Sequence, residues 1–254
     1  MVRIANNMRK LHVVVPMAGE GSRFKDAGYD MPKPLIEFDG KPLFVNAMKT
    51  IDNVPFDSIT FIVRKEHIDK WHIDETIKKW FPEAFILVVE QTTRGAAETA
   101  FFAIRNLILE DVADFTDSLL IMDCDVMVDN NEWRSIIQKS RFDGVLLSFE
   151  SNDPRYSYAG VVKGKVVKTA EKQTISTHAL TSPYFIKKIE DFVDAFHEME
   201  EYKEPDGTPT YKELYVSVLY NFMIANGKKV ILVNTDNITS LGTPEELEKA
   251  KQKK

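Results

Sequence analysis

The sequence predicts an α/β fold with a mainly parallel central sheet, on three observations. Short, wholly apolar segments typical of buried strands alternate with longer segments whose apolar residues recur at helical spacing. Strands that are apolar throughout belong to sheets covered by helices on both faces. Three segments with unusual chemistry each follow a predicted strand: residues 16–34, 91–96 and 123–125. Because ligands of such sheets bind at the carboxyl ends of the strands, we expect these segments to form one site.

The first half of the chain, about residues 11–130, carries this alternation most clearly. Its predicted strands are residues 13–16, 58–64, 84–90 and the apolar run that ends at 122. Its predicted helices are residues 41–51, 66–81 and 95–109. This order is typical of βαβ units, which produce parallel strands.

The second half, about residues 140–247, has shorter strands with hairpin-like connections, which favours a mixed sheet. Strands are predicted at residues 142–150, 159–171 with a Lys-Gly turn, 180–187 and 229–233. Helices are predicted at residues 189–201, 211–226 and from Thr243 onward. With no repeat and no linker between the halves, we interpret residues 1–254 as a single domain.

Composition excludes several classes of protein. The chain of 254 residues is 44% hydrophobic and has a formal net charge of -6, which argues against binding to nucleic acid or to an anionic membrane. Its one cysteine, Cys124, can form neither an intramolecular disulfide nor a cysteine-based zinc cluster. The first residues lack the apolar core of a signal peptide, and no apolar stretch is long enough for a membrane span. We therefore expect a cytoplasmic protein.

The segment after the first strand predicts a phosphate-binding site. Gly19 and Gly21 permit backbone N–H groups to approach an anion, Arg23 can add charge-assisted hydrogen bonds, and Lys33 is held between two prolines. The dinucleotide fingerprint is not met, because it needs a third glycine where Phe24 stands and a helix that opens at once. The alternative is a tight turn with both cations in solvent.

Asp123 and Asp125 follow the apolar run Leu119–Met122. Side chains at positions i and i+2 of a strand point the same way, so the two carboxylates suit a hard cation such as Mg²⁺ that also binds phosphate oxygens. The alternative is a turn-forming pair that caps the next helix.

Gln91 and Gly95 follow the strand at 84–90. The Gln91 amide can recognise the edge of a base, and a glycine leaves room for a ring against the backbone. The alternative here is an ordinary helix N-terminus.

Taken in order, the motifs resemble those of the sugar-phosphate nucleotidyltransferase family. They are "PMAGEGSRF…PKPL", "QTTRGAAETA", "LLIMDCD", "GVV…AEK", "ELYVSVLYN" and "LGTPEEL", and the resemblance runs from about residue 11 to about residue 247. It implies a Rossmann-like nucleotide-diphospho-sugar transferase fold and the reaction of an NTP with a sugar phosphate to give an NDP-sugar and pyrophosphate. It further implies that residues 11–130 bind the nucleotide and residues 140–247 the sugar phosphate.

The resemblance also implies roles for single residues. Arg23 and Lys33 would be the catalytic cations. The nucleotide would be bound by Ala18, Gly19, Gly21, Ser22, Arg23, Gln91 and Gly95. The sugar phosphate would be bound by Gly160, Glu171 and Lys172.

For the metal, the resemblance implies Mg²⁺ bound by Asp125, with Asp123 beside it. Many relatives place a second metal-binding Asp two residues before the glycine of the final motif, where this chain has Ser240. Asp236 or a water molecule is the candidate substitute.

Two other classes stay open on the sequence. A glycosyltransferase that uses an NDP-sugar donor would explain Asp123 and Asp125 as its metal motif, but would leave Arg23 and Lys33 unexplained. A non-catalytic nucleotide-sugar-binding protein would not need either cation. We favour an enzyme that makes a precursor of surface or capsular polysaccharide, with a pyrimidine NTP as substrate and a homo-oligomer as its assembly.

Overall fold

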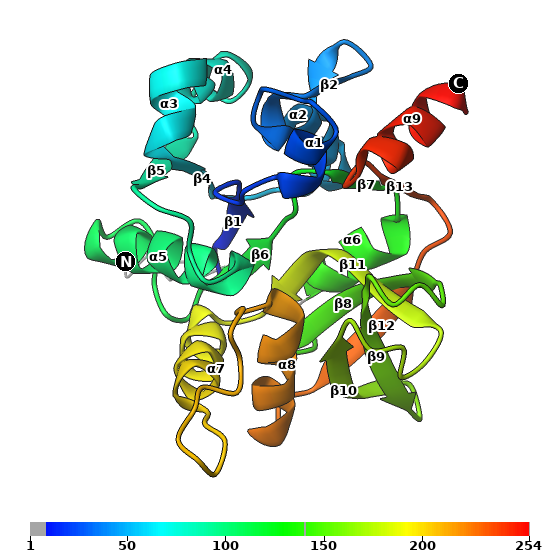
Figure 1. Cartoon of the computed structure of the whole chain (residues 1–254). Coiled ribbons are helices and arrows are strands. Elements are labelled where there is room, and N and C mark those ends of the chain that lie inside the picture. Colours follow the sequence, from blue (N-terminus) through cyan, green and yellow to red (C-terminus); the bar gives the residue numbers. More distant parts are fainter. Residues whose placement is uncertain (1–8, 140, 254) are drawn as a thin grey trace, which may run out of the picture.

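The structure, a computed structural model, describes residues 9–139 and 141–253. Its main feature is a nine-stranded sheet in the order β5-β4-β1-β6-β11-β8-β12-β10-β9 (Figure 1). The strands are β5 (Phe85–Val89), β4 (Ser58–Arg64), β1 (Leu11–Pro16), β6 (Ser118–Ile121), β11 (His178–Ile186), β8 (Gly144–Glu150), β12 (Val230–Asn234), β10 (Lys165–Glu171) and β9 (Ser157–Val162). The α/β prediction is confirmed.

The two predicted halves differ in strand direction. Strands β5, β4, β1 and β6 are all parallel to one another. Beyond them β11 runs antiparallel to both β6 and β8, and β12 is parallel to β8. Strands β9 and β10 form the predicted hairpin, so the second half contributes the mixed part of the sheet.

Helices cover both faces of the sheet, as apolar strands require. Val14 of β1 faces one hydrophobic core, and Val13 and Val15 face the other, because side chains alternate along a strand. The first core is closed by α5 (Ala96–Leu109), α7 (Ile189–Glu201) and α8 (Val216–Ala225) (Figure 1). The second is closed by α2 (Leu43–Ala47), α3 (Lys65–Trp71), α4 (Ile73–Trp80) and α6 (Asn131–Lys139).

A third, smaller core packs the segment after β1 against the C-terminal part of the chain. Phe24 and Leu43 pack there with Leu241 and Leu247. The elements around this core are α1 (Ser22–Asp26), the 3-10 turn η1 (Lys33–Leu35), β2 (Glu37–Phe38), β3 (Lys41–Pro42), β7 (Val126–Val128), β13 (Ile238–Ser240) and α9 (Pro244–Gln252). Helices α1 and α9 accordingly lie on the same side of the sheet (Figure 1).

Four element predictions need correction. A short helix, α1, begins at Ser22, where we expected only a loop. The helix predicted at 66–81 is divided into α3 and α4 by His72, whose φ of 48° is left-handed. The helix predicted at 41–51 is α2 followed by the 3-10 turn η2 (Met48–Ile51). The helix predicted from 211 begins only at Val216, because the N–H of Leu214 donates to the carbonyl of Arg94.

A buried polar network joins three strands at the amino-terminal edge of the parallel sheet. His12 is fully buried; its Nε2 lies 3.2 Å from Asp117 Oδ2, and its Nδ1 lies 2.7 Å from Ser58 Oγ. A carboxylate only accepts, so Nε2 donates to Asp117, and Nδ1 shares a hydrogen bond with the Ser58 hydroxyl. The Asp117 carboxylate also accepts the backbone N–H groups of Lys10 and Asp114. This serine, histidine and aspartate set is buried away from the pocket, so we assign it to stability.

Within the described residues, no helix is both long enough and apolar enough to cross a membrane.

Candidate active site

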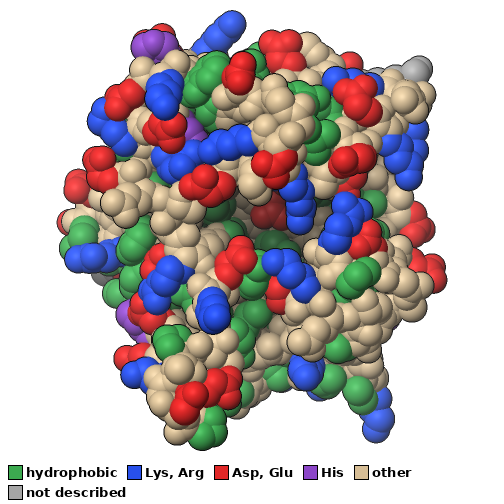
Figure 2. All heavy atoms as spheres, in the orientation of Figure 1, with side chains coloured by type: hydrophobic (Ala, Val, Ile, Leu, Met, Phe, Trp, Pro, Cys, Tyr) green, Lys and Arg blue, Asp and Glu red, His purple; other side chains and the backbone are tan. Residues whose placement is uncertain are grey.

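A pocket of about 260 Å³ opens where β6 ends. It brings together Arg23, Lys33, Asp123, Asp125 and Glu171, which come from segments far apart in the sequence. Figure 2 shows the hollow near the middle of this face, with acidic and basic side chains around it. Each of the three predicted segments contributes to its lining, although segment 91–96 contributes only Ala96.

Lys33 and Asp125 form an ion pair inside this pocket. Lys33 Nζ lies 2.5 Å from Asp125 Oδ2. The lysine is held in the turn η1 between the buried prolines Pro32 and Pro34. Gly21 lies beside it, and a Cβ added to Gly21 would be 3.4 Å from Lys33 Cβ. Burial by itself would lower the pKa of the Lys33 ammonium, but the charge of Asp125 raises it above its usual value. Lys33 therefore carries its positive charge into the pocket at any physiological pH.

Asp123 and Asp125 also interact with each other. Burial, followed by the negative charge of Asp125, raises the pKa of Asp123 to about 7. The backbone around them is fixed: the Asp123 N–H donates to Ser182 Oγ at 2.8 Å, and the Leu241 N–H donates to the Asp125 carbonyl at 2.8 Å. Two carboxylates that repel each other are stabilised by a shared cation, and Lys33 provides one such charge here.

This donor set fits Mg²⁺. Among the residues that the structure describes, no group of three or more His, Cys, Asp or Glu side chains is placed to hold a metal ion. Mg²⁺ does not need such a group, because it usually binds one or two carboxylates and takes its other ligands from water and from substrate phosphates. Asp125 and Asp123 are the residues that would hold it.

Glu171 lines the pocket at the end of β10. Its carboxylate accepts hydrogen bonds from the hydroxyls of Ser157 and Ser217. Tyr184 lines the same region, and burial together with the charges of Asp123 and Glu171 raises the pKa of its hydroxyl. Acceptors and donors at fixed positions are what recognition of a hydroxylated ligand requires.

The other residues of the predicted phosphate loop lie beside the pocket. Ala18 is buried directly after β1, and Gly19 and Ser22 are exposed at the start of the loop and of α1. Gly21 has φ 63°, which favours glycine, and is the N-cap residue of α1. The loop therefore borders the pocket in which Arg23 and Lys33 lie.

Like Ala18, Gly19, Gly21 and Ser22, five more of the predicted site residues that the structure describes lie outside the pocket lining: Gln91, Gly95, Gly160, Lys172 and Asp236. Gln91 and Asp236 are exposed. Gly160 lies in strand β9. Lys172 lines a neighbouring pocket, and its ammonium donates to the hydroxyl of Tyr215, which lines both pockets, at 2.5 Å.

Gly95 has a structural reason to be glycine. Its φ is 143°, and a Cβ would lie 2.5 Å from the carbonyl oxygen of Leu214. That carbonyl accepts the N–H of Ala97 at 3.0 Å, and the Leu214 N–H donates to the Arg94 carbonyl at 2.7 Å. The segment after β5 is thus joined by its backbone to the segment that enters α8.

Sequence reasoning missed several side chains of this pocket, among them Arg155, Tyr156 and Glu246. Glu246 accepts hydrogen bonds from Ser240 Oγ at 2.8 Å, from the Gly242 N–H at 3.1 Å and from the Tyr156 hydroxyl at 3.1 Å. The sequence pattern Thr-Pro-Glu-Glu indicated only a helix start, and Thr243 does cap α9 by accepting the Glu246 N–H. Only the tertiary packing of α9 shows that Glu246 also reaches the pocket.

The nucleotidyl transferase family model matches residues 13–202 of this chain. The match covers most of the sequence, so the chain belongs to this family. It is accordingly a nucleotidyltransferase, which confirms the resemblance of the motifs.

Solved structures agree with this assignment. A nucleoside-diphosphate-sugar pyrophosphorylase from Vibrio cholerae RC9 is 29% identical, with a TM-score of 0.81, and the match covers 93% of this chain and 98% of that one. The inositol-1-phosphate CTP transferase from T. maritima shares the fold at 15% identity, with a TM-score of 0.73 and coverage of 94% and 92%. No curated protein sequence matches the chain.

Proposed function

We propose that this protein transfers a nucleoside monophosphate from an NTP to a sugar 1-phosphate or a similar phosphorylated head group. The products are an NDP-sugar, or its equivalent, and pyrophosphate. The observation that carries the proposal is the contact of the Lys33 ammonium with Asp125 in a pocket that also holds Arg23 and Arg155. Three cations around two interacting carboxylates suit two phosphate groups and a metal ion.

The chemistry needs little from the protein beyond position and charge. A phosphate oxygen of the acceptor attacks the α-phosphorus of the NTP, and the bond from that phosphorus to the bridging oxygen of the β-phosphate breaks. The electron pair leaves with pyrophosphate. Lys33 and Arg23 offset the repulsion between the two phosphates and the charge that develops on the leaving group. The acceptor phosphate is already anionic, so it needs no base to activate it.

Mg²⁺, when bound, would supply charge neutralisation and orientation for the phosphate oxygens. Asp125 and Asp123 would hold it, and Lys33 would then be released to the phosphates. Ser157 and Ser217 hold the Glu171 carboxylate toward the acceptor. We assign Gln91 to the base and the Gly19–Ser22 segment to the triphosphate, because both border the same edge of the sheet.

The substrates and cellular role are proposed on the family resemblance. A pyrimidine NTP is favoured, and the acceptor class agrees with the nucleoside-diphosphate-sugar pyrophosphorylase, the neighbour with 29% identity. We place the reaction in the cytoplasm, where NTPs are supplied, and in the synthesis of precursors for surface or capsular polysaccharide. A homo-oligomer stays a prediction that light scattering can test.

The test is pyrophosphate release by the purified protein with Mg²⁺, each of the common NTPs and a panel of sugar phosphates, inositol 1-phosphate and phosphocholine. We expect release that needs both an NTP and one acceptor. Sugar transfer from an NDP-sugar without pyrophosphate would show a glycosyltransferase instead. Binding of NDP-sugars without turnover under any combination would show the non-catalytic alternative.

A further inference from the structure

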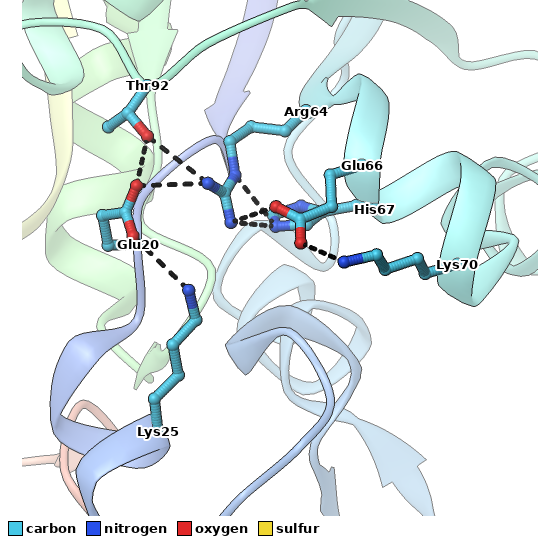
Figure 3. Close-up of polar contacts among 7 residues, drawn as sticks. All are labelled: Glu20, Lys25, Arg64, Glu66, His67, Lys70 and Thr92. Carbon is cyan, nitrogen blue, oxygen red and sulfur yellow. Dashed lines mark hydrogen bonds and ion pairs between the residues drawn. The ribbon is translucent and has the colours of Figure 1, made fainter.

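Arg64, the last residue of β4, is a buried arginine that joins two separate loops. Its residue exposure is 8%, and its Nη1 donates to Glu20 Oε1 at 3.1 Å and to Thr92 Oγ1 at 3.4 Å. Thr92 in turn donates to the same Glu20 oxygen at 2.6 Å. Figure 3 shows the resulting triangle, in which each corner comes from a different segment of the chain.

The two joined loops are those assigned to the nucleotide. Glu20 stands between Gly19 and Gly21 in the loop after β1, and Thr92 directly follows Gln91 in the loop after β5. Strand β4 lies between β1 and β5 in the sheet, so Arg64 projects from the strand that separates the two loops. Removal of its guanidinium would therefore remove a hydrogen bond from each of the two loops.

The other side of the Arg64 guanidinium is also fixed. Its Nε and Nη2 lie 3.1 and 3.0 Å from His67 Nε2, and Glu66 lies 3.5 Å from Nη2. Arginine only donates, so His67 Nε2 must accept. Burial, followed by the charge of Arg64, lowers the pKa of His67 to about 4, which keeps the imidazole neutral and able to accept. Because His67 and Glu66 fix one side of the planar Arg64 guanidinium, its Nη1 group points in a defined direction toward Glu20 and Thr92.

We propose that Arg64 is a positioning residue for the nucleotide: through Glu20 and Thr92 it holds the triphosphate loop and the base loop in one fixed arrangement. The proposal rests on the proposed assignment of these loops to the NTP. Arg64 itself contacts no substrate in it. Lys25 adds a weaker contact to the second Glu20 oxygen, at 3.4 Å between two exposed side chains.

The test compares KM values for the NTP and for the acceptor in variants of the complete protein. In Arg64→Gln and Glu20→Gln we expect KM for the NTP to rise about tenfold, since each loses a charge-assisted hydrogen bond, while kcat and the acceptor KM stay within about twofold. The double variant Arg64→Gln/Glu20→Gln should have the same NTP KM as Arg64→Gln alone, because both substitutions remove the same hydrogen bond. Thr92→Val should raise the NTP KM about threefold. Thr92→Ser keeps the hydroxyl, so its NTP KM should equal that of the wild type.

Arg134 provides a matched control. Its side chain is 12% exposed, against 10% for Arg64, and it pairs with the exposed Asp129 at 2.7 Å without lining the pocket. Arg134→Gln should change thermal stability only.

The inference is overturned if Glu20→Gln and Thr92→Val, which alter exposed side chains and should fold normally, leave the NTP KM unchanged, or if Arg134→Gln raises it equally. A wild-type protein that neither binds nor turns over any NTP would instead overturn the proposed function.

Discussion

The two ends of the parallel strands use polar residues in opposite ways. At the amino ends, the buried His12 ring has a protein partner on each nitrogen, Ser58 and Asp117. At the carboxyl ends, one open pocket is lined by Lys33, Asp123 and Asp125. The charge of Lys33 only partly offsets the repulsion between the two carboxylates. A satisfied network stabilises the fold, whereas charges held near each other in a pocket are available to a ligand. One set of strands thus places a stabilising network at one end and a candidate site at the other.

The largest expected effect lies at the carboxyl ends. Asp125→Asn removes the charge that pairs with Lys33, and we expect turnover to fall on the order of 10²- to 10³-fold, because this charge positions Lys33 and would bind Mg²⁺. The melting temperature should change little. The measurement is kcat from pyrophosphate release together with a thermal unfolding curve. Asp129→Asn, an exposed aspartate nearby in the sequence, is the control and should leave kcat unchanged.

Gly95 is an expected exception to the separation of stability from chemistry, because it lies at the carboxyl ends of the strands but supports the fold. Gly95→Ala places a methyl group against the Leu214 carbonyl at a φ of 143°, and we expect the free energy of unfolding to fall by about 3 kcal/mol. Denaturant unfolding measures this loss. If the variant were as stable as wild type and only the NTP KM rose, Gly95 would serve the base rather than the packing.

His12→Ala should have the opposite effects to Asp125→Asn: it should lower stability and leave turnover unchanged. It leaves Ser58 and Asp117 buried without their partner, so we expect the free energy of unfolding to fall by roughly 2 to 3 kcal/mol. At a temperature where the variant is folded, its kcat and both KM values should match those of wild type. A loss of turnover without a loss of stability would contradict the separation between the two ends.

The smallest effect concerns pH. The pKa of His67 is about 4 in the folded protein and near 6.5 when unfolded, so the unfolded state binds more protons between these values. The contribution of His67 to the free energy of unfolding is fully present above about pH 6.5 and is lost as the pH falls toward 4. Arg64, Glu66, Lys25 and Glu20 are the charged groups around it.

Urea unfolding at several pH values, compared with His67→Gln, measures this contribution. Glutamine can still accept from Arg64 but does not titrate, so its stability curve should be flatter between pH 6.5 and pH 4. Parallel curves for the two proteins would show that His67 is not the titrating group.

Much of the fold was predictable because it follows local patterns. The alternation of apolar strands and amphipathic helices predicts the sheet, and the position of three segments after strands predicts where Lys33 and Asp125 meet. The failures have physical causes. Helix α1 is only five residues long, too short to show a periodic pattern, and the left-handed His72 divides a helix that the pattern made continuous.

The candidate site was predictable only where one segment carries its own signal. The loop with Arg23 and Lys33 and the pair Asp123 and Asp125 have such signals. Glu246 and Arg155 reach the pocket through tertiary packing, which no local pattern encodes. Arg64 was missed for a similar reason, since its partners Glu20 and Thr92 are distant in the sequence.

The small core around Phe24 has a consequence for biosynthesis. Phe24 belongs to α1, near the beginning of the described chain, whereas its neighbours Leu241 and Leu247 are translated much later. The ribosome therefore releases the segment after β1 long before the residues that pack against Phe24 exist. We expect the parallel strands β1, β4, β5 and β6 to be able to pair before this small core can form.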